Sequence, residues 1–332
     1  MNIRLLSIYA VVTGKLLAGV DGSVKIHGIP ATKPDEKLYL AAARSFQGGH
    51  WATSARWFDE LISRFPDSSR RTKATLLLGQ ALFQQENYRE AYGFLSNNRL
   101  AAGELSDEYL YWMAECRLGQ GNLDAANQVF AELLRSFPKS PRVLEATVAS
   151  AFVAAAREDW IRVVTLLRPA EGVFQVQAGN GFEEDVLQEG GLLLAEALLE
   201  QKNPTSARLL LDKFPRALKR SRGWRRDLLR IRIAEAMGQP KEAFEEASKL
   251  RDATNNTGED LWFVQVVQLQ SQLLAGQEKW IESANIYNSL IDPKFDLAIR
   301  QRLILNQHDY YILEEIAFLR SNGLSRCLRT LT

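Results

Sequence analysis

The sequence has few of the residues from which catalytic and metal sites are usually built. Its 332 residues include three histidines, His27, His50 and His308, which are isolated and lack the spacing of metal ligands. It contains no glycine-rich phosphate loop, no GxGxxG motif and no GxSxG motif. We therefore expect no enzyme activity, no metal and no cofactor.

Cysteine, net charge and long apolar runs are also scarce. The two cysteines, Cys116 and Cys327, are far apart, and we interpret Cys116 as a buried small residue. A net charge of +1, from 41 basic and 40 acidic residues, gives no overall attraction to nucleic acid or anionic membrane. No apolar run after the N-terminus reaches the roughly 20 residues of a transmembrane helix. At 46% hydrophobic residues the chain can nevertheless bury a core.

The N-terminus resembles a secretory signal. MNIR supplies a basic start, residues 5–12 are apolar and small residues follow, although Lys15 interrupts the run. We interpret residues 1–19 as a signal peptide and residues 20–35 as a linker. The alternative is the first helix of a cytoplasmic protein.

A spacing pattern of four residues, called the frame below, recurs along the chain. A small residue is followed by a bulky residue nine positions later, a second small residue at twelve and a large apolar residue at sixteen. LGQALFQQENYREAYGFL supplies Gly79, Tyr88, Ala91 and Leu95 in this frame. The bulky residues of the successive copies are Trp51, Tyr88, Leu123, Trp160, Pro204, Pro240 and Trp280. The steps between them are 37, 35, 37, 44, 36 and 40 residues.

The frame predicts pairs of antiparallel helices joined by tight turns. The two small residues would mark the closest approach of the two backbones, and the bulky residue would fill the space beside the turn. We expect the large residue at sixteen to pack into the next pair. Because one pair cannot bury its apolar face alone, the pairs are expected to stack. The predicted fold class is all-α.

Over roughly 36–292 the chain resembles the tetratricopeptide-repeat family, whose repeats are about 34 residues long. The resemblance implies a right-handed α-α superhelix that acts as a non-catalytic scaffold for protein–protein interaction. We expect about four repeats in residues 36–168 and about three in residues 184–292. A connecting loop rich in Pro and Gly separates them at 169–183, and a degenerate helical pair or cap follows at 293–332.

The residues that end two of the predicted helix pairs are typical of one subgroup of the family. RFPDSS at 64–69 and SFPKSP at 136–141 are similar to bacterial cell-envelope members, including those associated with the Tol–Pal system and with outer-membrane assembly. The assembly lipoprotein is anchored through an N-terminal cysteine, which this chain lacks. The expected location is the periplasm or cell envelope, with the cytoplasm as the alternative.

The resemblance also implies a binding groove lined by the first helix of each pair. The candidate groove residues are Tyr39, Phe46, Leu76, Gln80, Phe83, Tyr111, Trp112, Glu115 and Phe152. Such an apolar and aromatic groove suits a peptide segment or a folded protein partner rather than a small-molecule substrate. The alternative is that several of these aromatic residues pack between repeats.

One cluster of positive charge stands out in this nearly neutral chain. The segment 215–232, PRALKRSRGWRRDLLRIR, contains Trp224 and the basic residues Arg216, Lys219, Arg220, Arg222, Arg225, Arg226, Arg230 and Arg232. We interpret it as a solvated loop and helix start with its apolar residues facing the core. As alternatives it would bind an acidic protein or lipid headgroups, with peripheral membrane association, or, with weaker support, nucleic acid.

Overall fold

The computed structural model describes residues 33–179, 181–182, 184–215, 218, 220–257 and 260–287. In these residues the regular structure consists of the α-helices α2 to α16 and two short 3-10 helices, with no strand. The predicted all-α fold class is confirmed. The expected signal peptide at 1–19, residues 20–32 of the linker and the expected cap at 293–332 lie outside the described residues.

The chain divides into two compact units, residues 1–197 and 198–332, with the boundary inside α11. The helices up to the boundary are α2 (Pro34–Gln47), α3 (Trp51–Arg64), α4 (Arg71–Gln84), α5 (Tyr88–Asn97), η2 (Arg99–Ala101), η3 (Gly103–Leu105), α6 (Ser106–Gly119), α7 (Leu123–Ser136), α8 (Val143–Ala156), α9 (Trp160–Leu167), α10 (Val173–Ala178) and α11 (Asp185–Glu200). Those after it are α12 (Pro204–Leu211), α13 (Arg220–Ala236), α14 (Pro240–Asn256), α15 (Asp260–Ala275) and α16 (Trp280–Ile286). We had expected the division within 169–183.

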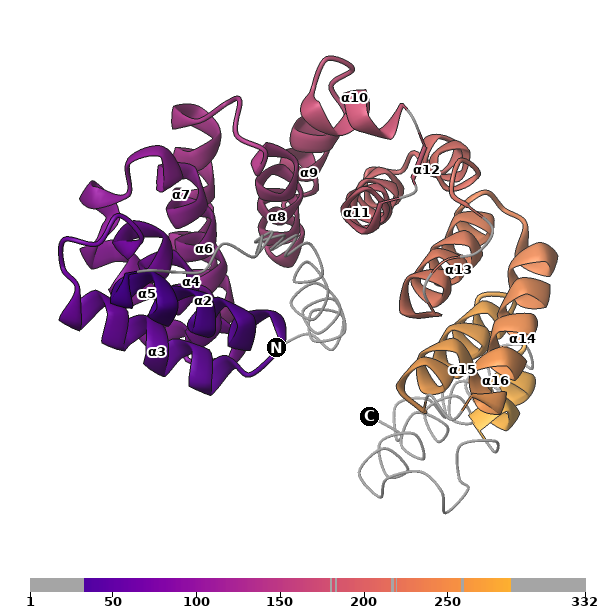
Figure 1. The fold of residues 1–332 in the computed structure, drawn as a ribbon. Coiled ribbons are helices and arrows are strands. Elements are labelled where there is room, and N and C mark those ends of the chain that lie inside the picture. Colours follow the sequence, from indigo (N-terminus) through magenta and orange to yellow (C-terminus); the bar gives the residue numbers. More distant parts are fainter. Residues whose placement is uncertain are drawn as a thin grey trace, which may run out of the picture. The chain divides into compact units, whose positions relative to one another are not determined.

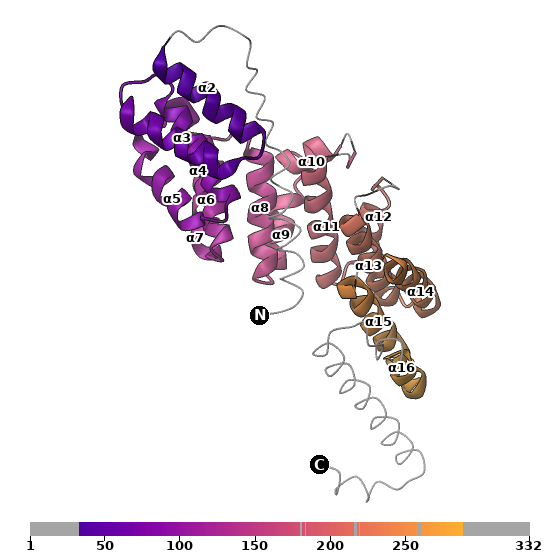
Figure 2. The ribbon, with the colours of Figure 1, turned by 60° about the horizontal axis from the view of Figure 1, so that its bottom comes forward.

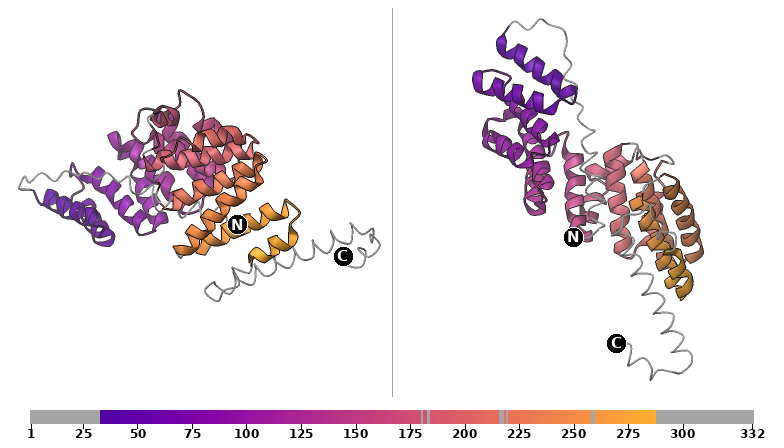
Figure 3. Two further views of the ribbon diagram at one scale, coloured as in Figure 1. Left: turned by 90° about the vertical axis from the view of Figure 1, so that its right-hand side faces the viewer. Right: turned by 90° about the horizontal axis from the view of Figure 1, so that it is seen from below.

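Within each unit the helices pack in the order of the chain. From α2 to α9 each helix lies against the next one, as the first unit shows in Figures 1 and 2. The same is true from α12 to α16 in the second unit, whose helices lie in successive layers in Figure 3. Short connections force consecutive helices to run antiparallel, so each unit is a stack of helical hairpins.

All seven predicted bulky residues begin a helix. They are the first residues of α3, α5, α7, α9, α12, α14 and α16, which are Trp51, Tyr88, Leu123, Trp160, Pro204, Pro240 and Trp280. Each of these helices is the second of its pair. The two prolines occupy a position where the missing N–H has no partner to lose. The sequence frame therefore locates these helix starts to the residue.

The small residues of the frame lie where the two backbones of a pair meet. The Ser54 hydroxyl donates to the Ala42 carbonyl over 3.0 Å. In the last described pair, the Ser271 and Ser283 hydroxyl oxygens lie 2.7 Å apart, and Ser283 also donates to the Ser271 carbonyl over 2.8 Å. All four residues are buried. A hydroxyl reaches a backbone carbonyl of the other helix only where the two helices approach closely, as the frame predicts.

The large residue at the sixteenth position also packs within its own pair. A Cβ placed on Gly79 would lie 2.8 Å from Leu95 Cδ2, so Leu95 covers the small residue of its own pair. The bulky residue contacts the next pair, because a Cβ on Gly119 would lie 2.7 Å from the Tyr88 ring.

The turn inside each pair has the same backbone conformation. The residue two positions before each second helix has a positive φ, and these residues are Gly49, Glu86, Gly121, Glu158, Lys202, Gly238 and Glu278. Their φ angles lie between 60° and 75°. Glycine adopts this conformation without penalty, whereas a residue with a Cβ is strained there. Packing of the two helices therefore imposes the turn even where the sequence supplies glutamate or lysine.

The segment 169–183, expected to be a connecting loop, contains helix α10. Its Phe174 is fully buried, and a Cβ on Gly190 of α11 would lie 2.3 Å from the Phe174 ring and 3.0 Å from Val148. The prolines and glycines of this segment favour turns, and for that reason the sequence did not predict the short helix between them. Burial of the Phe174 ring against α11 fixes the position of this helix.

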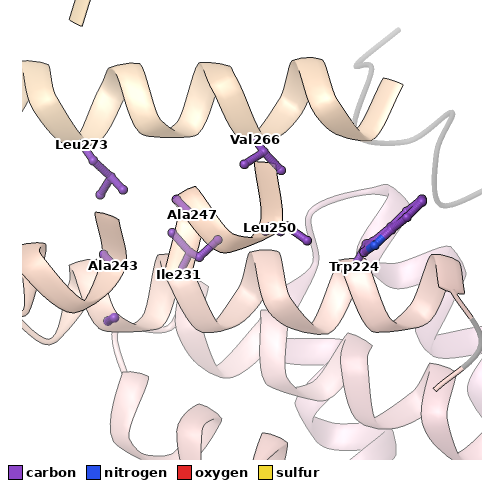
Figure 4. Packing of buried hydrophobic residues seen from close by; sticks show 8 residues of the cluster. Trp224, Ile231, Ala243, Ala247, Leu250, Val266 and Leu273 are labelled. Carbon is purple, nitrogen blue, oxygen red and sulfur yellow. The ribbon is translucent and has the colours of Figure 1, made fainter. Parts of the chain in front are cut away.

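The second unit has a core of its own, shared by three helices (Figure 4). Its buried members are Trp224, Ile231 and Ala234 from α13, Ala243, Ala247 and Leu250 from α14, and Val266 and Leu273 from α15. Small residues on the middle helix let α13 and α15 approach it closely, as expected of the repeat frame. Trp224 lies at one end of this core in Figure 4.

The turn geometry predicts opposite effects for two glycine substitutions. Gly121→Ala should lower the free energy of unfolding by about 1 kcal/mol, because alanine is strained at a φ of 73° although no atom obstructs its Cβ. Gly93→Ala should raise it by about 0.5–1 kcal/mol, because Gly93 lies inside α5 and a Cβ there meets open space. Urea denaturation followed by circular dichroism measures both. Two changes of the same sign would contradict this account of the turn.

Candidate functional site

The nine candidate groove residues all lie on first helices, and all are buried. Tyr39 and Phe46 are on α2, Leu76, Gln80 and Phe83 on α4, Tyr111, Trp112 and Glu115 on α6, and Phe152 on α8. Burial also runs without interruption through residues 74–83 of α4, which cover the full circumference of that helix. Helix α4 is therefore enclosed along this stretch, and the nine candidate side chains are positioned by packing.

Two of these aromatic residues pack within their own repeat. The Tyr39 ring lies 5.9 Å from the Phe58 ring, and the Tyr111 ring lies 6.2 Å from the Phe130 ring. Each tyrosine is three residues before a small residue of the frame, and each phenylalanine is sixteen residues after that small residue. The sides of Tyr39 and Tyr111 that make these contacts therefore pack in the core rather than line a groove.

The first pair is tied to its neighbour by a polar network that the sequence analysis missed. Ser68 donates to Asp35 over 2.6 Å, and Arg70 lies 3.3 Å from Glu36. The guanidinium of Arg70 also lies 5.4 Å from the centroid of the Tyr39 ring. Asp35 and Glu36 are in the first turn of α2, where carboxylates are favoured by the free backbone N–H groups.

The same network recurs 72 residues later in the third pair. Ser140 donates to Asp107 over 2.6 Å, and Arg142 donates to Glu108 over 2.8 Å. The guanidinium of Arg142 lies 5.0 Å from the Tyr111 ring. The signal was present in the sequence, where DEKLY at 35–39 and DEYLY at 107–111 match, as do the Ser-x-Arg triplets after each Phe-Pro.

Aromatic residues connect α4 with α6. The Phe83 ring lies 5.0 Å from the Tyr88 ring and 5.4 Å from the Trp112 ring, with edge-to-face geometry in both cases. Trp112 in turn contacts Tyr111, with the ring centroids 5.6 Å apart. Such pairs favour a fixed arrangement of the rings over a loosely packed one. The structure thus brings together three candidate residues from two repeats.

Glu115 of α6 is a carboxyl group in a buried position, with 4% of the residue exposed. Burial raises its pKa from the usual 4.5 to about 7, since an ionised carboxylate is poorly solvated there. Hydrogen bonding from Tyr111 and the charge of Arg142 oppose this rise in pKa, and the charge of Glu145 adds to it. Near neutral pH this group therefore exchanges between its charged and uncharged forms.

Buried polar atoms without a hydrogen-bond partner concentrate on the first helices. Within the described residues they include Trp112 Nε1 and Glu115 Oε1 on α6, Ser150 Oγ on α8 and Arg71 Nε at the start of α4. Leaving such a group unsatisfied costs about 1–3 kcal/mol, and buried polar groups are normally paired.

The basic segment is less exposed than we expected. Arg216 and Lys219 lie outside the described residues, and of Arg220 only the backbone is described. Arg222 is 1% exposed and Arg225 is 8% exposed, so neither offers its charge to solvent. Trp224 belongs to the core of the second unit, which leaves it unavailable for stacking on a base.

The remaining described arginines of this segment are engaged by the chain itself. Arg226 donates to Asp227 over 2.8 Å and to the Pro215 carbonyl over 3.1 Å. Arg230 lies 3.4 Å from Asp212. Arg232 pairs with Glu200 at 2.6 Å. These pairs neutralise much of the positive charge that the sequence suggested.

Groups suited to metal binding or thiol chemistry do not assemble in the part of the chain that the structure describes. There, no three His, Cys, Asp or Glu residues come close enough to hold a metal ion. Cys116 is a free, buried cysteine, as expected, and burial raises the pKa of its thiol well above the ordinary value. His50 precedes α3 at an exposed turn, while His27 and His308 lie outside the described residues.

Among the described helices, none is both long enough and apolar enough to cross a membrane.

The chain is similar to one family model and to several solved structures. A family model for subunit 3 of the anaphase-promoting complex, or cyclosome, matches residues 47–133, which hold α3 to α6 and most of α7. A tetratricopeptide repeat protein from Parabacteroides merdae has a similar structure, with a TM-score of 0.54, 12% identity and coverage of 82% of this chain and 98% of that one. Yeast Tom70 aligns with a TM-score of 0.45 at 11% identity, over 97% of this chain and 72% of its own. A search of the curated proteins finds no match.

The raised pKa of Glu115 predicts a pH-dependent stability. Between about pH 4.5 and 7 the folded chain keeps a proton that the unfolded chain has lost, so the free energy of unfolding should fall as pH rises. The fall attributable to Glu115 should reach about 3 kcal/mol by pH 8. Glu115→Gln should match the parent at pH 5 and exceed its stability at pH 8, as measured by urea denaturation. Glu104→Gln, at an exposed site, is the control and should follow the parent at both pH values. Parallel curves for the parent and Glu115→Gln would contradict the assignment.

Proposed function

We propose that this tetratricopeptide-type repeat protein is a non-catalytic scaffold that binds a segment of another protein along α4, α6 and α8. The repeat fold supports a role in protein–protein interaction, since stacked helical hairpins present a continuous series of side chains to an extended or helical segment. The proposed binding region contains the candidate residues of the second, third and fourth pairs, which are buried in the chain by itself.

One observation carries this proposal. The buried polar atoms that lack a partner lie on the first helices of the pairs, and in the first unit Trp112, Glu115 and Ser150 come from α6 and α8, the first helices of successive pairs. A fold without a partner has no reason to retain such costly groups in adjacent repeats. A bound segment that supplies a backbone carbonyl and a hydrogen-bond donor would pair with them.

The second helices offer no comparable surface in the described residues. Their exposed large apolar residues, Ile161 on α9, Leu209 on α12 and Ile281 on α16, lie on different pairs and stand singly. Isolated apolar residues are normal on a protein surface. They serve as controls for the proposed face.

We further propose that the protein acts in the bacterial cell envelope. The N-terminal pattern of a basic start, an apolar run and small residues supports export, as does the similarity of the FPDSS and FPKSP endings to envelope members of the family. The cytoplasmic alternative, a regulator acting through its basic segment, draws less support because the described arginines there are buried or paired.

Loss of two aromatic contacts should abolish partner capture. Phe83→Ala combined with Trp112→Ala removes rings that join α4 to α6, and we expect recovery of the partner to drop at least tenfold, since aromatic residues at an interface centre often contribute about 2 kcal/mol or more each. The measurement is a parallel pull-down from membrane and cytosolic extracts with the tagged full chain. The milder pair Phe83→Leu and Trp112→Phe tests the same contacts if the alanine variant unfolds.

Ile161→Ser is the matched control, because it changes an exposed residue of the second helix α9. Capture should be unchanged in this variant. Undiminished capture by a folded Phe83/Trp112 variant, or loss of capture in Ile161→Ser, would show that the partner binds elsewhere.

Export predicts a shortened N-terminus. We expect N-terminal sequencing of the protein isolated from its native cells to begin about 18–20 residues after Met1, since signal peptides are removed from the mature chain. An intact Met1 in material recovered from the cytosol would instead support the cytoplasmic alternative.

A further inference from the structure

Resting on the proposed function, we infer that the bound segment carries a lysine or arginine among apolar residues, and that its charged group binds Glu115. The inference concerns the chemistry of the partner at one position between α6 and α8. It follows from the groups around Glu115, which leave one buried carboxylate oxygen without a partner.

The basic residue whose charge acts on Glu115, Arg142, already binds two other carboxylates. Arg142, immediately before α8, donates through Nε to Glu108 over 2.8 Å and through Nη1 to Glu145 over 3.3 Å. Its guanidinium also lies 5.0 Å from the Tyr111 ring. Arg142 therefore stabilises two other carboxylates and supplies no direct bond to Glu115 Oε1.

The net charge of the residues around Glu115 favours binding of a positively charged group. Glu108, Glu115 and Glu145 surround the single guanidinium of Arg142, so the group has a net charge of −2 when all three carboxyl groups are ionised. Attraction between opposite charges is stronger in such a poorly hydrated setting than in water. An anionic or neutral residue of the partner would leave this charge uncompensated.

The neighbouring aromatic residues suit the same ligand. The rings of Tyr111 and Trp112 pack edge to face beside Glu115 along α6, and Phe83 of α4 contacts Trp112. The faces of aromatic rings attract ammonium and guanidinium groups, and their apolar area would contact the methylene groups of a lysine or arginine. The unpaired Trp112 Nε1 and Ser150 Oγ would bind backbone groups of the segment.

Binding of a cation here requires the charged form of Glu115. The groups that face it are Tyr111 of α6, Arg142 before α8 and Glu145 of α8, and the adjacent Cys116 is an uncharged thiol. Since the pKa of the free carboxyl is about 7, binding below that pH must release a proton. The affinity for a cationic segment should fall about tenfold between pH 8 and pH 6.

Labelled peptides of ten residues test the inference on the full chain. Three peptides share the same leucine and alanine residues and differ only at a central lysine, glutamine or glutamate. By fluorescence anisotropy at pH 8, the lysine peptide should bind at least about tenfold more tightly than the glutamine peptide, and the glutamate peptide most weakly. The preference for lysine should decrease at pH 6.

Glu115→Gln is the informative variant, because it keeps the shape of the side chain and removes its charge. It should bind the lysine and glutamine peptides equally at both pH values, whereas Glu104→Gln should behave as the parent. Equal binding of all three peptides by the parent would overturn the inference and leave the proposed function standing. Retained preference in Glu115→Gln would overturn the role of Glu115. Absence of binding by every peptide would count against both proposals.

Discussion

Close contact between two helix backbones is the constraint on which this structure depends. At the recurring small positions the helices approach until a serine hydroxyl of one reaches a carbonyl of the other, as for Ser54 and Ala42. A larger side chain at Gly79 or Ala126 would force the pair apart and open gaps in a densely packed interior. The remaining features of each pair, including its turn and its contact with the next pair, follow from this approach.

The turns show how far packing overrides local preference. Glycine supplies the positive φ in three of the seven pairs, and Glu or Lys adopts it in the other four at some local cost. Because each turn is held by two packed helices, the stack tolerates that strain. Turn residues are consequently a weak signal of the repeat, whereas the bulky residue that begins each second helix is a strong one.

The part of the first unit proposed to bind a partner uses the same rigid framework. Rings at Phe83, Trp112 and Tyr111 extend across two pairs, and the network of Arg142 fixes the start of α8 beside them. Glu115 stands out because one of its carboxylate oxygens, Oε1, is buried without a hydrogen-bond partner, while Glu108 and Glu145 both pair with Arg142. A scaffold whose backbone is set by helix contacts can keep such a group ready for a ligand without reorganising.

Much of the fold was accessible to sequence reasoning because it depends on short-range spacing. Residues nine, twelve and sixteen positions apart belong to one hairpin, so their pattern indicated the pairs, the helix starts and the buried alanines Ala91, Ala126 and Ala207. Candidate residues such as Trp112 and Glu115 came instead from the resemblance to the repeat family. Helix α10 was missed because its position depends on Phe174 packing against Gly190 of another helix.

The sequence by itself therefore determined that this chain is a series of helical hairpins, and where each second helix begins, because those properties arise from neighbours within one pair. Only the tertiary structure decided the state of individual charges. Arg222 and Arg225 become buried, Arg142 pairs with Glu108 and Glu145, and Oε1 of Glu115 is left without a hydrogen-bond partner. These outcomes depend on three-dimensional packing, which brings Arg142 to Glu108, 34 positions away, and sets the balance between desolvation and pairing.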